Sequence, residues 1–303
     1  MSTFRPGRRR IVRSDESVRT VARHDFDAPN AERAVKRLSA RRHEAREDIE
    51  TDVLGPGFAL ERSYNEFASR CGADPRAADS ETWLAFARAL QGGGALFLTA
   101  TRREGEEVEF RYGEDVIRRP ATGPTQDSDA MNWLKTVYLA IVARDRARLE
   151  LLAAVPVDLL RESGPQYDEF VFDWVRALQG HVRGEGDLIE TVLAAMRGTE
   201  PEALRGSTPE AVLQLYFPPI ELFYLYTQRE DGKFADALFT ALELHKQYWT
   251  ADPERPRDTT SIVALAPLAM ACLARDAGMA FDVESDYLPH HLLVGTRVGE
   301  ITI

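Results

Sequence analysis

Residues 234–293 read FADALFTALELHKQYWTADPERPRDTTSIVALAPLAMACLARDAGMAFDVESDYLPHHLL and predict two apolar helices joined by a polar loop. Apolar residues recur one turn apart in the first helix, and the second, near residues 261–277, is apolar almost all round. A helix of the second kind must be covered on most sides by other elements. This stretch therefore predicts the hydrophobic core, with buried leucines at Leu238, Leu242, Leu265, Leu268 and Leu273.

The same pattern of a long apolar helix, a short charged turn and another helix recurs along residues 126–303. The turns are expected near Arg144, Arg183 and Arg229, at spacings that are typical of stacked helical hairpins. We therefore predict an all-α array of antiparallel helical hairpins, similar in shape to tetratricopeptide or α-solenoid proteins. Pro218-Pro219 is expected to separate two helices within it.

The N-terminal part divides into two regions. Residues 1–27 are rich in arginine and predict a flexible basic arm. Residues 28–125 predict helices and one small β-hairpin near 107–119, where apolar and charged residues alternate before a glycine turn. The triplet Gly92-Gly93-Gly94 interrupts a helical pattern, so a break, a kink or a close helix contact is expected there.

Composition favours a soluble protein of the cytoplasm. Apolar residues make up 44% of the chain and charged residues 29%. We find no secretory signal and no apolar run that reaches the length needed to span a bilayer, so no membrane association is expected. Cys71 and Cys272 lie far apart in apolar helical patterns and are expected to be buried thiols in a reducing compartment.

Charge is unevenly distributed. Residues 1–46 hold 13 Lys and Arg against 6 Asp and Glu, whereas the remaining residues hold 25 against 43. An acidic body disfavours direct binding to nucleic acid, which requires a cationic face. It favours a basic protein partner through long-range electrostatic attraction. The alternative interpretation is that the acidity serves solubility alone.

The search for catalytic and ligand-binding motifs is negative. The sequence lacks the nucleophile elbow, the zinc-protease motif, paired CxxC motifs, a phosphate-binding loop and an EF-hand loop. We therefore predict that the protein is not an enzyme and uses no cofactor or metal ion. The oligomeric state is not indicated by the sequence.

One acidic segment is the candidate partner-binding site. In an extended strand, Asp282, Glu284 and Asp286 share one face, and nearby Tyr287 and Trp249 are candidate aromatic anchors for a partner. Two other interpretations stay open for the three acids, a solvated linker and a metal or acid–base site. For the two aromatic residues, the alternative is that they pack the C-terminal turn onto the helices.

Two parts of the chain resemble a known family. HKQYW followed by LAPLAMACLARDAGMAFDVESDYLPHHLL, and YLAIVARDRARLELLAAVPVDLLR followed by FVFDWVRALQGHVRG, resemble the Imm49 family of bacterial immunity proteins over most of residues 130–293. The resemblance implies an all-α protein of a polymorphic toxin system that binds and neutralises a cognate toxin. The alternatives are a helical-repeat adaptor with another partner and, less favoured, a hydrolase that uses the acids at 282, 284 and 286.

Overall fold

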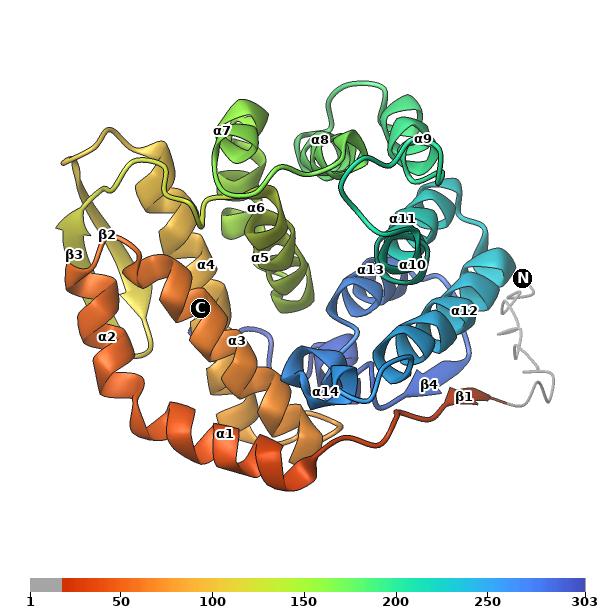
Figure 1. The fold of residues 1–303 in the computed structure, drawn as a ribbon, viewed down its shortest axis with the longest axis horizontal. Helices are drawn as coiled ribbons and strands as arrows, with labels where there is room; N and C mark the ends of the chain where they lie inside the picture. The colour runs from red at the N-terminus through yellow and green to blue at the C-terminus, as the bar shows by residue number, and fades with distance from the viewer. Residues whose placement is uncertain (1–17, 303) are drawn as a thin grey trace, which may run out of the picture.

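The protein is described by a computed structural model that covers residues 18–302, and its helices confirm the all-α fold (Figure 1). Its first elements are β1 (Arg19–Val21), α1 (Ala28–Ala40), α2 (Arg42–Thr51), α3 (Gly55–Ala73), α4 (Ser80–Thr101), β2 (Glu107–Tyr112) and β3 (Asp115–Pro120). The middle elements are α5 (Ala130–Ala143), α6 (Arg146–Ala153), α7 (Val157–Glu162), α8 (Glu169–Arg183), α9 (Leu188–Gly198), α10 (Pro209–Ala211), the π-helical η1 (Val212–Tyr216) and α11 (Phe217–Gln228). The last are α12 (Asp231–Thr250), the 3-10 helices η2 (Arg255–Arg257) and η3 (Thr259–Ile262), α13 (Leu265–Asp276), β4 (Val283–Ser285) and α14 (His290–Val294).

The three expected turns are confirmed, between α5 and α6, α8 and α9, and α11 and α12. Each preceding helix ends on a residue with left-handed backbone angles, Arg144 at φ 57°, Gly184 at φ 66° and Arg229 at φ 59°. This conformation costs a non-glycine residue roughly 1–2 kcal/mol. At Arg144 the guanidinium offsets it by donating to the carbonyls of Leu292 and Leu293 at 2.8 Å each, which ties the first turn to α14.

The array is not linear, because its two ends meet. β1 pairs in parallel with β4, in the register Arg19↔Val283 to Val21↔Ser285, and the elements between them surround the middle of the molecule (Figure 1). The prediction of a flexible arm over residues 1–27 is therefore wrong for residues 18–27, and residues 1–17 lie outside the described part. The arm holds this position because Val21 is buried and the Arg23 guanidinium donates to the carbonyls of α3.

The glycine triplet makes a close helix contact, while α4 runs through it without a break. A Cβ atom on Gly92 would lie 2.6 Å from the backbone nitrogen of Leu60 in α3, and one on Gly93 would lie 2.4 Å from Oγ1 of Thr136 in α5. Glycine is thus required because α3 and α5 approach α4 too closely for any side chain.

The proline pair does not separate two helices, so that prediction is wrong. The chain passes from α10 through η1 into α11, and Pro218 and Pro219 occupy the first turn of α11, where a missing N–H costs little. The π-helical turn of η1 comes directly before them, and its hydrogen bonds span one residue more than those of an α-helix.

The β-hairpin is confirmed as β2 and β3, paired from Glu107↔Pro120 to Tyr112↔Asp115. A hairpin is marginal alone, and this one rests on helices, because Tyr112 and Ile117 join a small buried cluster with Ile49 of α2 and Ala59 of α3. The basic hairpin residue Arg119 is also buried and donates to the carbonyl of Ile49 at 2.7 Å.

The main core extends as one cluster from Val21 to Leu293. Of the five leucines expected in it, four are buried and Leu273 is only partly buried. Both thiols are buried and unpaired, as expected. The segment Thr259–Asp276 has a mean hydropathy of 1.2 and is long and apolar enough to cross a membrane, a property that the sequence interpretation overlooked. In the structure 67% of this segment is buried within the protein, as in the core helix of a globular fold.

Candidate functional site

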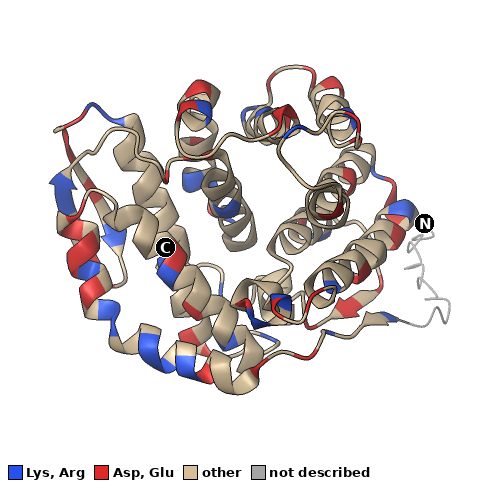
Figure 2. Cartoon of the chain, viewed as in Figure 1, with Lys and Arg blue, Asp and Glu red and all other residues tan. Residues whose placement is uncertain are grey.

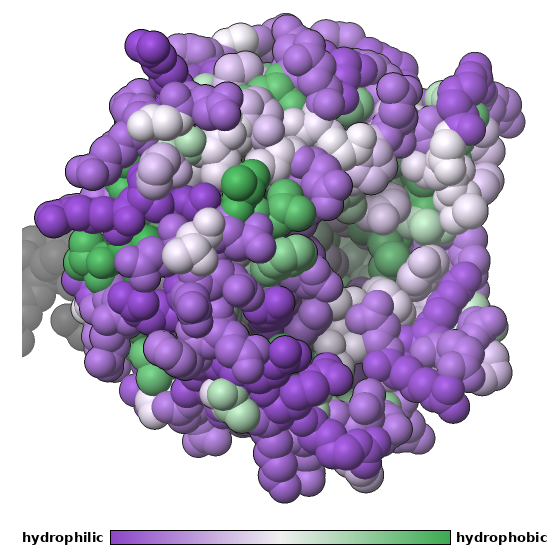
Figure 3. Space-filling view, turned by 60° about the vertical axis from the view of Figure 1, so that its left-hand side comes forward, coloured by the Kyte–Doolittle hydropathy of each residue, from purple (hydrophilic) through white to green (hydrophobic). Residues whose placement is uncertain are grey.

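A cavity of about 320 Å³ lies between helices from most of the chain, and we call it the central cavity. Its wall is mainly aliphatic and aromatic. The residues that line it are Tyr64, Met131, Asn132, Leu134, Lys135, Tyr138, Phe170, Val171, Trp174, Leu215, Tyr216, Pro219, His245, Trp249, Thr260, Ala264, Leu265, Ala266 and Pro267. Figure 3 shows the molecular surface hollowed on one face, with apolar residues inside the hollow and hydrophilic residues around it. Cavities of this size and polarity are typical of ligand-binding sites.

Lys135 is the cation in this wall. It is on α5, and its Nζ lies 5.2 Å from the centroid of the Tyr64 ring, in a cation–π contact. Burial lowers the pKa of Lys135, while the more distant carboxylates of Glu61, Asp129 and Asp258 act in the opposite direction. Because desolvation disfavours an ammonium ion, a further negative group beside Lys135 would be stabilising.

Trp249, one of the predicted partner-binding residues, is on α12 and lines the central cavity. Its ring packs against Tyr248 at 5.1 Å and His245 at 6.1 Å between centroids. Its indole Nε1 is buried and has no hydrogen-bond partner in the described part of the chain. An indole N–H usually finds an acceptor when buried, and this one lies behind the cavity wall, where water cannot reach it.

Asp282, Glu284 and Asp286 alternate along β4 and are all exposed, whereas Val283 between them is buried. The expected alternation of exposure is therefore present, although only Glu284 is within the strand and Asp286 is in the turn after it. Figure 2 shows acidic residues on β4 and along the neighbouring α12. Among residues 18–302 there is no group of three His, Cys, Asp or Glu side chains arranged to hold a metal ion.

Tyr287 is not an exposed anchor, and the prediction that it offers its ring to a partner is corrected. Its side chain is 0% exposed. The ring packs edge-on against His245 of α12 at 4.7 Å, and its hydroxyl lies 2.6 Å from Nδ1 of His24. Residue 287 continues the alternation of exposure and is buried as Val283 is, which is the packing role that the sequence interpretation had left open. His245 contacts both Tyr287 and Trp249, so these two aromatic residues belong to one interior layer.

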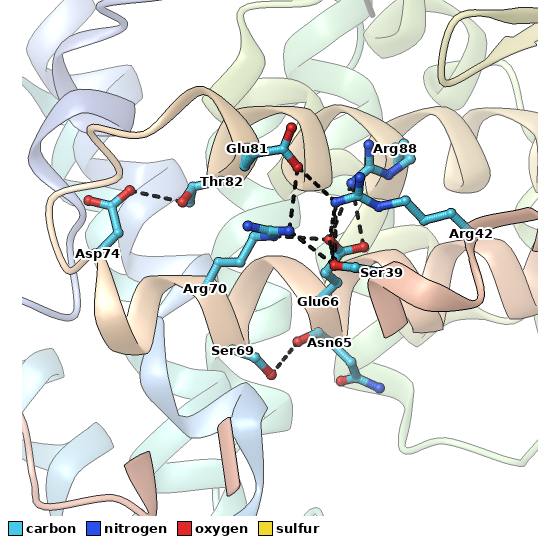
Figure 4. A network of polar contacts seen from close by, with 10 residues as sticks. All are labelled: Ser39, Arg42, Asn65, Glu66, Ser69, Arg70, Asp74, Glu81, Thr82 and Arg88. Atoms are coloured by element: carbon cyan, nitrogen blue, oxygen red, sulfur yellow. Dashed lines mark hydrogen bonds and ion pairs between the residues drawn. The ribbon is translucent and has the colours of Figure 1, made fainter. Parts of the chain in front are cut away.

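A second polar cluster, absent from the sequence interpretation, joins the first helices (Figure 4). The carboxylate of Glu66 on α3 has a side chain only 3% exposed and pairs with Arg42 at 2.6 Å, Arg70 at 2.9 Å and Arg88 at 3.4 Å. Burial alone would raise the pKa of Glu66, but these arginines hold it below its ordinary value. The cluster joins α2, α3 and α4 through a satisfied buried charge, which is a structural role.

The family comparison decides the wider assignment. The family model for immunity protein 49, Imm49, matches residues 74–292. The chain belongs to the Imm49 family. The match includes α4 to α13 and β4, and therefore every residue that lines the central cavity except Tyr64 of α3. No curated protein and no solved structure matches the chain.

The central cavity was missed from the sequence because its residues are spread over elements far apart in the chain. Lys135 looked like one polar residue in the apolar stretch WLKTVYLAIVA. The only available signal was that position: a lysine inside an apolar helix, near no acidic residue at helical spacing, must reach solvent or a cavity.

Proposed function

We propose that this Imm49 protein neutralises a cognate toxin by forming a stoichiometric complex with it in the cytoplasm of the producing cell, without catalysing a reaction. The family assignment over residues 74–292 carries this proposal, because the family consists of immunity proteins. A toxin is thus the expected kind of partner, and covering its active site is the simplest way for a protein without a catalytic motif to protect a cell.

The contact surface that we propose is the acidic face of β4 together with the adjoining face of α12. The three carboxylates at 282, 284 and 286 are exposed, and Glu243 of α12 is exposed and near Tyr287. Two arginines lie beside this face, Arg19 of β1 in an ion pair with Asp236 of α12 and Arg23 near Asp286, so the acids outnumber the bases there. These charges favour a basic toxin surface through electrostatic complementarity.

The test begins by searching the neighbouring genes for one that encodes a toxin domain. Cells that express this domain are expected to survive when the present chain is co-expressed, and the two purified proteins are expected to elute together at a one-to-one ratio. An immunity protein that acts as an enzyme would instead protect the cells at a molar amount far below that of the toxin. Protection without a complex would contradict the proposal. So would a complex of this chain with a protein other than the toxin, if the cells are not protected.

A further inference from the structure

We infer that the central cavity binds a small apolar molecule with a single carboxylate group, which Lys135 neutralises. This ligand site does not rest on the proposed toxin complex. It follows from two properties of the cavity: an apolar wall and an ammonium group without an ion pair.

The ammonium group lacks a counter-ion. Within residues 18–302, Nζ of Lys135 makes no hydrogen bond or ion pair, and its contact is the face of the Tyr64 ring. Lys135 is only partly buried, and an occupant of the cavity would displace water from its ammonium group; a desolvated ammonium ion without a negative partner is costly. An anion in the cavity removes this cost, whereas a cationic or neutral occupant does not.

Of the three carboxylates that act on Lys135, Glu61 is exposed and makes no ion pair within residues 18–302, whereas the other two are engaged as helix caps. Asp129 caps α5 by accepting from the backbone N–H of Met131 at 2.7 Å, and it also accepts from the hydroxyl of Tyr167 at 3.0 Å. Asp258 caps η3 by accepting from the backbone N–H and the hydroxyl of Thr260 at 2.9 Å and 2.8 Å. Moving either carboxylate to Lys135 would leave a helix end without its cap, which costs about 1 kcal/mol.

The ammonium group of Lys135 is a donor alone, so its partner in the cavity must be an acceptor. Among the neutral polar groups of the wall, Asn132 donates to Asp129 and the hydroxyl of Tyr138 accepts from Trp174 at 2.7 Å, whereas the hydroxyls of Tyr64 and Tyr216 make no hydrogen bond within residues 18–302. A hydroxyl can donate as well as accept, so these two can also pair with a carboxylate. The wall therefore suits an acceptor with a negative charge, as a carboxylate is.

The size and polarity of the cavity define the rest of the ligand. A volume of 320 Å³ holds about ten groups of the size of a water molecule, at about 30 Å³ each. A phosphate or dicarboxylate would bring more negative charge than one lysine can neutralise, and the aliphatic and aromatic wall offers the excess charge no partners. An eight-carbon fatty acid such as octanoate has the required charge, length and apolar body.

The experiment measures octanoate binding to the full chain by calorimetry and by the rise in melting temperature. Octanol and octylamine are matched probes that have the same chain without the carboxylate. The expected order is octanoate well above octanol, with octylamine weakest. Equal binding of octanoate and octanol, or no binding of octanoate at millimolar concentration, would overturn the inference.

Two variants locate the site. Lys135→Met keeps the length and apolar part of the side chain, and it is expected to weaken octanoate binding about tenfold or more while octanol binding is unchanged. Lys233→Met removes an exposed lysine of α12 and is expected to leave both affinities unchanged. If Lys135→Met and Lys233→Met weaken octanoate equally, the anion binds elsewhere.

A third variant keeps the test informative if Lys135→Met does not fold. Ala266 is partly exposed and lines the cavity from α13, so Ala266→Phe places a ring in the ligand's volume. This variant is expected to lose both octanoate and octanol binding. Unchanged octanoate binding to Ala266→Phe would show that the ligand does not occupy the central cavity.

Discussion

The hydroxyl of Tyr287 lies 2.6 Å from Nδ1 of His24, although 263 positions separate the two residues. The same hydroxyl accepts a hydrogen bond from the backbone N–H of His24 at 3.1 Å, and the other ring nitrogen of His24 lies 3.3 Å from Oγ of Ser261. This buried cluster holds the segment after β1 against the C-terminal helices, next to the pairing of β1 with β4.

Tyr287→Phe is expected to lower the free energy of unfolding by roughly 1–3 kcal/mol, because it leaves a buried N–H and an imidazole nitrogen without their partner. Urea denaturation measures the change. The matched control is Tyr248→Phe, since Tyr248 is a partly exposed tyrosine of α12, and its variant should stay within about 0.5 kcal/mol of the parent. Equal losses in both variants would show that the His24 contact is not the cause.

Stability should also fall with acid through His245. Burial lowers the pKa of His245 to about 4, and burial likewise lowers that of His24. The unfolded chain therefore binds more protons than the folded one between pH 6.5 and pH 4. The contribution of His245 is complete above its unfolded pKa of about 6.5 and is lost as pH falls toward 4, by roughly 3 kcal/mol over that range.

Unfolding free energies at pH 7.5, 6, 5 and 4.5 measure this dependence. His245→Gln should flatten the part of the curve between pH 6.5 and pH 4 relative to the parent, at the cost of a lower overall stability. His43→Gln, which changes an exposed histidine of α2, should leave the slope as it is. A parent curve that is level down to pH 4.5 is incompatible with this account.

Two leucines of α13 that the sequence predicts to be equally buried differ in the structure. Leu268 is 0% exposed, whereas Leu273 is partly buried at the edge of the core. Leu268→Ala is expected to cost roughly 2–5 kcal/mol, the usual range for a fully buried leucine. Leu273→Ala should cost clearly less, because part of its side chain is already hydrated. Thermal or urea unfolding of the two variants provides the comparison, and equal costs would show that α13 is rotated from the described orientation.

Gly93→Ala is expected to destabilise the protein although alanine is the better helix former. The new Cβ would lie 2.4 Å from Oγ1 of Thr136, so α4 and α5 must move apart, at about 1–3 kcal/mol. Gly232→Ala in the first turn of α12 meets nothing within 4 Å and should be neutral or stabilising by up to about 1 kcal/mol. Melting temperatures of both variants decide whether the helix contact or helix propensity dominates at Gly93.

The sequence predicted the elements and turns because these depend on local patterns. Leu238 and Leu242 recur at helical spacing, and the alternation of Asp282, Glu284 and Asp286 with apolar residues predicted β4. It did not predict contacts that join distant segments: the pairing of β1 with β4 is formed by three residues of an arginine-rich arm that lacks a strand pattern.

The candidate site was predicted only in part, for the same reason. The acidic face of β4 lies within six residues of sequence, so its geometry could be predicted. The same alternation places Tyr287 on the buried side with Val283, but its contact with His24 could not be predicted, because His24 is at the other end of the chain. The central cavity depends on the packing of Lys135 and Trp249 with residues of several other elements, and no spacing in the sequence relates these two positions.

The last prediction concerns how the proposed complex forms. If a basic toxin meets the acidic face of β4, replacing Asp282, Glu284 and Asp286 with Asn, Gln and Asn should lower the association rate and change the dissociation rate little, because exposed charges act mainly on encounter. The effect should be largest at low salt and should shrink as ionic strength rises. Stopped-flow mixing with the purified cognate toxin domain, at two salt concentrations, measures both rates. The matched control replaces Glu104, Glu106 and Glu107 beside the β-hairpin with Gln, which removes the same charge from three exposed residues on another part of the surface. If the control slows association as much as the β4 variant does, net charge alone attracts the toxin and β4 is not its docking face; unaltered rates in both variants would remove electrostatic attraction from the mechanism.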